Sequence, residues 1–393
     1  MPTNKQPLDL VLINMSNFWE WQKGVSNRNY HILRELEKNP NINRIVCLDY
    51  PPLTWKRAAR NLKESILTPL DNGTVIQRDL FSRTTKISDR LYVHGSLRSV
   101  RSPESYFRHF KSALSKLGIT EFVLWSFFPP LTEAAMSTLQ PKFTIFDAVD
   151  NWAEHSSYAG MKERLKKSYE YIKNNVDVIF TVADDLQNLF DHQKNVYWIP
   201  NGVDLKHYQK PWRLVNRDIS DLPKPIIGYI GVIQNRVDLE LIKYLAKENP
   251  HYSLVLCGPV WYRDDFKALE EYKNIHLLGF KHYEEAPMYI NFFDVGIIPH
   301  KKDNFISSTN PMKMYEYLAC GKPVVASESA GAEMFQGEAL IAENYEDFNL
   351  KIRQALKSTS EEDKQRRQKL IEKHSWSKAV QQMLEIIYHK MNY

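Results

Sequence analysis

A lysine stands where a helix is expected to begin. The stretch NPMKMYEYLACGKPVVAS, residues 310–327, reads as a short helix followed by a buried strand, with Asn310 as the N-cap and Pro311 in the first turn. Lys313 then lies at the positive end of the helix dipole, which disfavours a cation by roughly 0.3–1 kcal/mol. Two explanations fit this position: an exposed pair with Glu316, or a phosphate bound by the lysine and the helix N-terminus together. The residues alone leave both open.

Two further charged residues follow predicted strands. Asp150 comes directly after KFTIFDAV (142–149), where a carboxylate can serve as a general base or can simply cap the next element. Arg236 follows GYIG (228–231) and can bind phosphate or pair with a nearby acid such as Asp238 or Glu240.

Familiar phosphate and metal motifs are absent from the sequence. There is no G-x-x-x-x-G-K-[ST] loop, no G-x-G-x-x-G, and no Asp-x-Asp pair that would hold a metal diphosphate. The charge of a bound diphosphate would therefore have to be balanced by protein cations and helix dipoles. We accordingly expect no metal site and no cofactor, with the phosphorylated ligand being a substrate.

Short apolar runs alternate with amphipathic stretches along the chain, a pattern typical of parallel α/β domains. The pattern predicts two Rossmann-like, doubly wound domains facing a central cleft, residues 1–200 and 225–375, joined by a proline-rich linker, 201–224. The amphipathic helix in 376–393 is expected to return to the first domain. The predicted strands are 8–14, 44–50, 121–127, 142–149, 176–183 and 195–200, then 226–231, 252–258, 274–280, 294–300 and 322–327.

The composition is that of an ordinary globular protein. The chain has 393 residues, of which 43% are hydrophobic and 25% charged, and it has no apolar run long enough to span a membrane. The start carries no apolar segment of the kind found in secretory signals, and the three cysteines show no metal spacing. These features predict a cytoplasmic protein.

Positive charge is concentrated in one block. Residues 51–116 contain 13 Lys and Arg but only 5 Asp and Glu, a surplus of 8 (13 − 5) in a chain whose net charge is +5. The block is either an ordinary solvated surface or a face that contacts an anionic membrane or polymer. No nucleic-acid reader motif accompanies it, so nucleic acid is not an expected partner. The aromatic segment NFWEWQ (17–22) is either core packing or a platform for a sugar ring.

Several of these stretches occur together, and in the same order, in the GT-B glycosyltransferases. The chain resembles family 4 of these enzymes in IPNGVD (199–204), GYIGVIQNRVDLELI (228–242), LVLCGP (254–259), LLGFKHYEEAPMYINFFDVGIIP (277–299) and residues 310–327. The stretch FDAVDNW (146–152) also resembles the teichuronic-acid and exopolysaccharide glycosyltransferases. The resemblance implies a cytoplasmic enzyme, at the inner face of the membrane, that moves a sugar from a nucleotide-diphosphate donor, expected to be UDP-linked, to a lipid-linked or polysaccharide acceptor.

The resemblance also implies roles for individual residues. Glu316 matches the second acid of the family's E-x7-E motif, which binds the ribose hydroxyls. Lys313, with the amides near Asn310 and Pro311, matches the phosphate-binding helix start. The remaining matches are Gly231 and Arg236 for the phosphates, Phe280 for the nucleotide base, Gly24 for the glycine loop near the acceptor, and Asp150 for a base.

One position departs from the family pattern. The first acid of E-x7-E should stand eight residues before Glu316, and Ser308 occupies that place. The family's first acid approaches the donor sugar, so the identity of the sugar and the retaining or inverting outcome stay open. Xanthan-type glucuronosyltransferases resemble the chain both here and around Asp150. Two other functions also remain open: a non-hydrolysing UDP-sugar 2-epimerase, and a non-catalytic glycan-binding subunit with the same fold.

Overall fold

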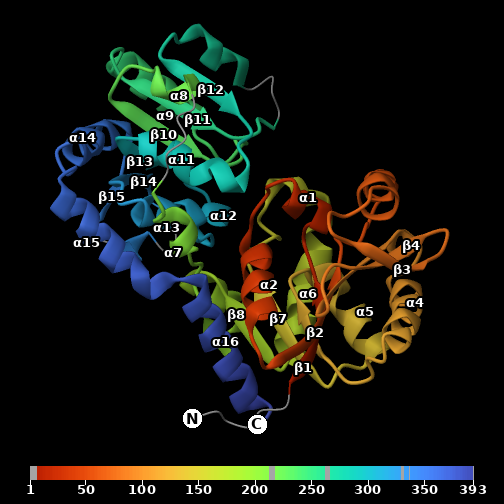
Figure 1. The fold of residues 1–393 in the computed structure, drawn as a ribbon. Coiled ribbons are helices and arrows are strands. Elements are labelled where there is room, and N and C mark those ends of the chain that lie inside the picture. The colour runs from red at the N-terminus through yellow and green to blue at the C-terminus, as the bar shows by residue number, and fades with distance from the viewer. Residues whose placement is uncertain (1–6, 212–216, 262–265, 329–331, 336, 393) are drawn as a thin grey trace. The chain divides into compact units, whose positions relative to one another are not determined.

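The computed structural model shows two compact α/β units (Figure 1), and it describes the whole chain except residues 1–6, 212–216, 262–265, 329–331, 336 and 393. Unit 1 comprises the described residues up to Val182, then Leu186–Ile199 and the described residues from Val380 onward. Unit 2 comprises Ala183–Asp185 and the described residues of 200–379. Part of the predicted linker lies outside the described residues.

Unit 1 is built on a nine-stranded sheet with the order β3-β4-β5-β2-β1-β6-β7-β8-β9. The strands from β5 to β9 along this order run parallel, whereas β3 and β4 form an antiparallel edge. Their bounds are β1 Leu8–Ile13, β2 Ile42–Leu48, β3 Thr74–Arg78, β4 Ser82–Lys86, β5 Leu91–Ser96, β6 Val123–Ser126, β7 Phe143–Ala148, β8 Val178–Thr181 and β9 Val196–Trp198.

Amphipathic helices cover the sheet of unit 1. Helix α2 shows why they form, since Asn27 caps its N-terminus by accepting a hydrogen bond from Tyr30 N, and Ile32, Leu33 and Leu36 are buried along one face. The helices of this unit are α1 Phe18–Gln22, α2 Arg28–Lys38, α3 Trp55–Asn61, the π-helical turn Leu62–Leu67, α4 Pro103–Lys116, α5 Pro129–Leu139 and α6 Lys162–Asn175.

Unit 2 is built on a six-stranded parallel sheet with the order β12-β11-β10-β13-β14-β15. The strands are β10 Ile226–Ile230, β11 Ser253–Cys257, β12 Ile275–Gly279, β13 Val295–Ile298, β14 Val324–Ser327 and β15 Ala339–Ala342. The helices are α7 Leu205–Tyr208, α8 Arg217–Ser220, α9 Leu239–Glu248, α11 Ala286–Phe292, α12 Asn304–Ser307, α13 Met312–Ala319, α14 Tyr345–Ala355, α15 Glu361–Ile371 and α16 Trp376–Lys390.

The two doubly wound α/β units agree with the predicted fold class. Each predicted apolar run forms a strand, and helix α16 runs from unit 2 into unit 1, where the Tyr388 hydroxyl donates to Asn41 O at 3.1 Å. Strands β3, β4, β5 and β15 were not predicted. Along the described residues, no helix is both long and apolar enough to cross a membrane.

A buried ion pair joins the first residue of α2 to the end of β7. Arg28 Nε donates to Asp147 Oδ1 at 2.8 Å, and the two side chains are 3% and 0% exposed. Burial raises the pKa of Asp147, and the guanidinium opposes that rise. Each charge therefore depends on the other, because neither has bulk water around it.

We expect Arg28→Ala to destabilise unit 1 strongly. Removing one partner of a buried pair leaves an uncompensated charge and costs about 3–5 kcal/mol. Urea unfolding followed by circular dichroism measures the loss, and Arg34→Ala, which removes an exposed pair with Glu37 on the same helix, is the matched control at about 0–1 kcal/mol. Equal stabilities of the two variants would contradict the role of the pair.

Candidate functional site

The loop after β10 approaches the start of α13 closely in unit 2. Gly231 directly follows that strand with φ +139, and a Cβ built there would lie 3.1 Å from Lys313 Cε and 3.3 Å from its Nζ. Glycine is therefore required both for the backbone conformation and for the close approach. The lysine ammonium lies 5.1 Å from the centre of the Tyr229 ring, which fixes the side chain at the carboxyl ends of the parallel strands.

Helix α13 begins at Met312, with Pro311 as its N-cap residue. The prediction of Asn310 as the N-cap is thus wrong by one residue. The Asn310 side chain instead accepts hydrogen bonds from Asn201 N at 2.9 Å and from the Tyr315 hydroxyl at 2.8 Å. These bonds fasten the segment that enters unit 2 to the start of the helix, and Lys313 remains in the first turn, at the positive end of the dipole.

Three basic side chains lie at this helix start, and one of them, Arg236, lowers the pKa of the other two. Burial, and after it the Arg236 guanidinium, lower the pKa of Lys313 to about 8, whereas Glu316 raises this pKa. Burial, Lys313 and Arg236 together lower the pKa of His300 well below its ordinary value. Like charges that repel one another here would be relieved by a bound anion. We call the side chains of Arg236, His300 and Lys313 the cation cluster. Their geometry and charges describe a candidate site for an anion.

Arg236 is held by its own loop. The side-chain oxygen of Gln234, in the orientation that satisfies its hydrogen bonds, accepts from Arg236 Nε at 2.6 Å and Nη2 at 2.5 Å. The neighbouring acids have other partners, since Asp238 caps α9 and Glu240 pairs with Lys243. Among the described residues Arg236 makes no ion pair, so the surface-pair explanation of this residue is wrong.

His300 was not predicted as a site residue. It lies two residues after β13, it is 3% exposed, and both of its ring nitrogens lack hydrogen-bond partners among the described residues. Its ring lies 6.3 Å from the Tyr229 ring, the same ring that Lys313 contacts. A buried imidazole with two unused nitrogens points to a ligand that is not part of the chain. The only signal in the sequence was its place at the end of a predicted strand.

Glu316 is buried rather than exposed. It is 9% exposed, burial raises its pKa, and the Tyr208 hydroxyl donates a hydrogen bond to it. The structure shows no ion pair between Lys313 and Glu316 among the described residues. An exposed Lys313–Glu316 pair therefore does not explain the lysine.

Two other predicted donor residues have clear local environments. Ser308 is buried, and its hydroxyl donates to Phe305 O at 2.7 Å, so no acid replaces the family's missing one at this position. Phe280 follows Gly279 at the end of β12 and its ring is 48% exposed. An exposed ring at a strand end can stack on a base. The roles of both residues stay predictions.

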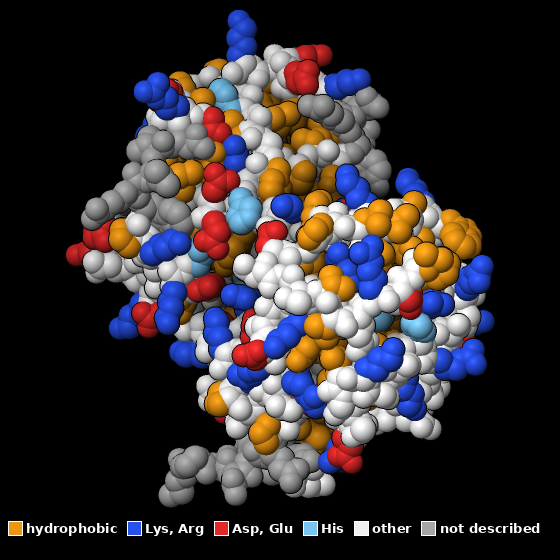
Figure 2. Space-filling view, turned by 45° about the vertical axis from the view of Figure 1, so that its right-hand side comes forward, with side chains coloured by type: hydrophobic (Ala, Val, Ile, Leu, Met, Phe, Trp, Pro, Cys, Tyr) orange, Lys and Arg blue, Asp and Glu red, His pale blue; other side chains and the backbone are white. Residues whose placement is uncertain are grey.

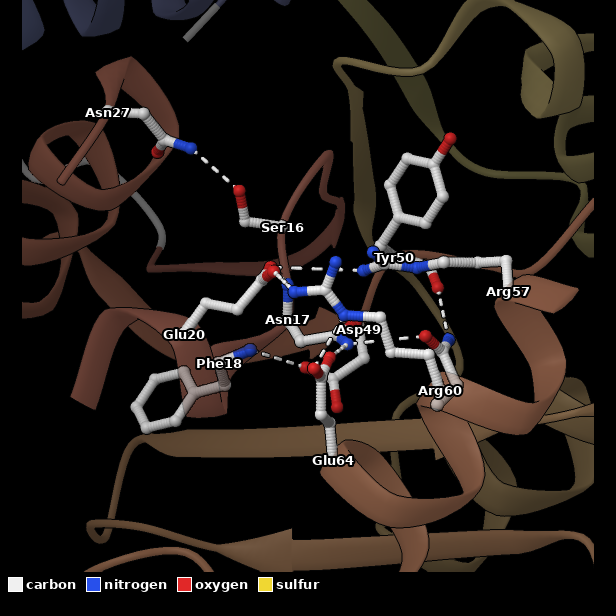
Figure 3. A network of polar contacts seen from close by, with 11 residues as sticks. Ser16, Asn17, Phe18, Glu20, Asn27, Asp49, Tyr50, Arg57, Arg60 and Glu64 are labelled. Atoms are coloured by element: carbon white, nitrogen blue, oxygen red, sulfur yellow. Dashed lines mark hydrogen bonds and ion pairs between the residues drawn. The ribbon is translucent and has the colours of Figure 1, made fainter. Parts of the chain in front are cut away.

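In unit 1, polar residues gather after β1 and β2 (Figure 3). Asn17 Nδ2 donates to Glu64 at 2.7 Å, and Arg60 bridges Glu64 and Glu20 at 2.6 and 2.7 Å. Phe18 N donates to Asp49 Oδ1 at 2.7 Å, and burial raises the pKa of this carboxyl to about 6. The network fixes the loop that leads to the predicted acceptor glycine.

The residues predicted for the acceptor side, Gly24 and Asp150, both belong to unit 1. Gly24 has φ +85, which glycine adopts without strain, and it precedes α2. In the aromatic segment before it, Phe18 and Trp21 are buried with their rings 5.8 Å apart, so these two rings are core packing and not a sugar platform. Asp150 is half-buried after β7, and its backbone oxygen accepts from the Tyr169 hydroxyl at 3.1 Å. Its catalytic role stays a prediction.

Comparison with known proteins finds sequence similarity over part of the chain. Residues 224–358 match the family described as glycosyl transferases group 1. The putative teichuronic acid biosynthesis glycosyltransferase TuaH of Bacillus subtilis (strain 168) is 28% identical over 229 residues, which cover 54% of this chain and 57% of that protein. The matched region thus spans little more than half of the curated relative.

Solved GT-B structures share the fold of the whole chain. Sucrose-phosphate synthase from Thermosynechococcus elongatus aligns with a TM-score of 0.71 at 16% identity, covering 97% of this chain and 98% of that one. HepE of Anabaena, solved with UDP and glucose, gives 0.66 at 14% identity, covering 97% and 99% of the two chains. TarM gives 0.65 at 13% identity, covering 98% and 99%. The expected GT-B fold is confirmed.

We expect Lys313→Met to weaken UDP binding while leaving uridine binding unchanged. Methionine keeps the packing of the side chain but removes the charge, and a hydrogen bond to a charged group contributes about 1.5–3 kcal/mol. Titration calorimetry with both ligands measures the difference, with Lys247→Met, an exposed lysine of α9, as the control. Unchanged UDP affinity in Lys313→Met would contradict the phosphate role.

We expect His300→Phe to weaken UDP binding by a smaller amount. The phenyl ring preserves the packing against Tyr229, and the lost neutral hydrogen bond contributes about 0.5–1.5 kcal/mol. The same calorimetry measures it, and uridine again reports any loss that has nothing to do with phosphate. If UDP and uridine weakened in parallel, His300 would have only a structural role.

Proposed function

We propose that this chain, with its group 1 glycosyl transferase domain and GT-B fold, transfers a sugar from a nucleotide-diphosphate donor to a lipid-linked or polysaccharide acceptor in envelope or exopolysaccharide synthesis. The observation that carries the proposal is the cation cluster at the start of α13, where Arg236 lowers the pKa of both Lys313 and His300. A diphosphate leaving group supplies the negative charge that this cluster lacks.

The cation cluster suits a reaction without a metal ion. As the bond between the sugar and the diphosphate breaks, negative charge grows on the departing phosphate. Lys313 and Arg236 can neutralise that charge, with His300 donating a hydrogen bond and the amides of the first turn of α13 adding the helix dipole. Stabilisation of this kind is greatest where charge develops, so the cluster acts on the chemical step as well as on binding.

The ribose and the base of the donor are assigned to neighbouring residues. Glu316, when ionised, can accept hydrogen bonds from the two ribose hydroxyls, and the exposed Phe280 ring can pack on the base. UDP is the proposed nucleotide because HepE was solved with UDP and glucose, and a TarM variant with UDP and a glycan. TuaH, the curated relative, is named for teichuronic acid biosynthesis, which supports an envelope polysaccharide as product.

Asp150 is the proposed acceptor-side residue. If the reaction inverts the anomeric centre, its carboxylate takes the proton from the acceptor hydroxyl as that oxygen attacks. If the configuration is retained, no enzyme base is needed and Asp150 orients the acceptor. Gly24 gives the neighbouring loop the backbone freedom to approach the acceptor. We also place the reaction in the cytoplasm, in peripheral contact with the anionic inner face of the membrane.

A screen of UDP-sugars with and without an acceptor glycan tests the proposal. Acceptor-dependent release of UDP supports glycosyl transfer. Conversion of UDP-N-acetylglucosamine without any acceptor would instead indicate a 2-epimerase. Failure to bind UDP at all would indicate a non-catalytic glycan-binding subunit.

We expect Asp150→Asn to lower the rate of transfer by about 10²–10⁴, as is typical when a general base is lost. Its affinity for UDP should hardly change, because Asp150 belongs to unit 1 and the cation cluster belongs to unit 2. Steady-state kinetics and UDP calorimetry on the same preparation separate the two effects. Wild-type turnover in this variant would leave Asp150 with a structural role only.

A further inference from the structure

Exposed apolar side chains are concentrated in one short part of unit 1. Thirteen large hydrophobic residues of the described chain are exposed, and seven of them fall between residues 55 and 81. These seven, which we call the apolar face, are Trp55, Leu62, Leu67, Val75, Ile76, Leu80 and Phe81. Single exposed apolar residues are normal, but such a concentration marks a surface with a partner.

The tip of the β3–β4 hairpin carries the most exposed of them. Leu80 is 81% exposed and Phe81 is 44% exposed, although both belong to a well-ordered turn. Asp79 organises this turn, because its carboxylate accepts from Phe81 N at 2.7 Å and from Ser82 N at 2.8 Å. His109 Nε2 also lies 2.6 Å from Asp79 Oδ2. The two apolar side chains are thus presented on a fixed loop.

Hydrogen bonds connect this tip to the helical part of the apolar face. Leu97 N donates to Phe81 O at 2.9 Å, and two residues later Ser99 Oγ donates to Pro52 O at 2.7 Å, three residues before Trp55. On the other side, Arg83 Nη1 donates to Thr68 O at 2.7 Å, directly after Leu67. The hairpin tip and both ends of the α3 and π-helical segment are therefore neighbours.

Basic residues without acidic partners surround the apolar face. Lys56, Lys63, Arg78 and Arg101 are exposed, and none of them forms an ion pair within the described part of the chain. Other bases nearby are already neutralised, as Arg60 is by Glu20 and Glu64, and Arg98 by Asp79. Figure 2 shows apolar and basic side chains gathered side by side on one face of unit 1.

We infer that the apolar face and its four unpaired bases dock on the surface of an anionic lipid bilayer. Tryptophan, leucine and phenylalanine can enter the boundary between headgroups and acyl chains, while lysine and arginine remain with the anionic headgroups. A second copy of the chain fits less well, because a two-fold contact through this face would bring the same unpaired bases together. The inference rests on the proposed function, which includes a peripheral membrane contact, and it names the surface of unit 1 that makes this contact, separate from the cation cluster and from Asp150.

Vesicle co-sedimentation of the full chain tests the inference. The wild type should bind vesicles of phosphatidylcholine with phosphatidylglycerol at least tenfold more tightly than vesicles of phosphatidylcholine alone, and salt should weaken this binding. The double variant Leu80→Ser, Phe81→Ser should lose at least tenfold in affinity for the anionic vesicles. The double variant Lys56→Glu, Lys63→Glu should lose both affinity and salt dependence.

Controls separate docking from folding and from catalysis. Leu350→Ser changes an equally apolar exposed residue of unit 2 and should bind vesicles like the wild type. All variants should keep the wild-type melting temperature and UDP affinity. Vesicle binding is measured independently of sugar transfer, so the test can be interpreted even if the glycosyltransferase proposal fails. Equal binding to neutral and anionic vesicles, or undiminished binding of the Leu80 and Phe81 variant, would overturn the inference. So would a wild-type dimer that the same variant dissociates, because the face would then be a protein contact.

Discussion

The repulsion between the charges of Lys313 and Arg236, beside a histidine whose pKa both of them lower, is the constraint on which the account depends. Burial already makes a charge on Lys313 costly, and the guanidinium of Arg236 adds to that cost, so the pKa of the lysine falls to about 8. A fold that brings such groups together without an anion gives up stability at this point. The same arrangement becomes favourable once a diphosphate binds, since its oxygens then provide the missing counter-charge and can accept a hydrogen bond from the N–H of His300.

Much of unit 2 serves to hold these groups in place. The parallel strands end together, so the loop after β10, the loop after β13 and the helix before β14 come from separate stretches of sequence to one edge. Gly231 lets the loop approach Lys313, Gln234 orients Arg236, and Asn310 ties the entering chain to the start of the helix. Glu316 lies about one turn further along α13, where the Tyr208 hydroxyl donates a hydrogen bond to it.

Whether a feature of the structure could be predicted from the sequence depended on the kind of residue that forms it. Strands that are continuous apolar runs in the sequence, such as β8, β11 and β13, were predicted. Strand β4 was missed because SRTTK contains no apolar residue, although four of its five side chains are buried by polar contacts with the neighbouring segments.

Among the site residues, Lys313 could be singled out because its charge opposes the helix dipole. His300 could not, since a histidine at a strand end has no distinctive spacing and its significance lies in the two nitrogens left without partners. The exposure of residues 55–81 was equally invisible in the sequence, which showed only the charge around them.

Proton uptake on UDP binding is the most direct test of the cation cluster. With a pKa of about 8, Lys313 is about half protonated at pH 8 in the free protein, and a bound diphosphate should raise that pKa and complete the protonation. Calorimetry of UDP binding at pH 8 in buffers with different ionisation enthalpies should therefore show an uptake of up to about half a proton. The uptake should be absent with uridine and with the Lys313→Met variant. UDP binding by the wild type at pH 8 without proton uptake would contradict the account, because the diphosphate would then not be the counterion of Lys313.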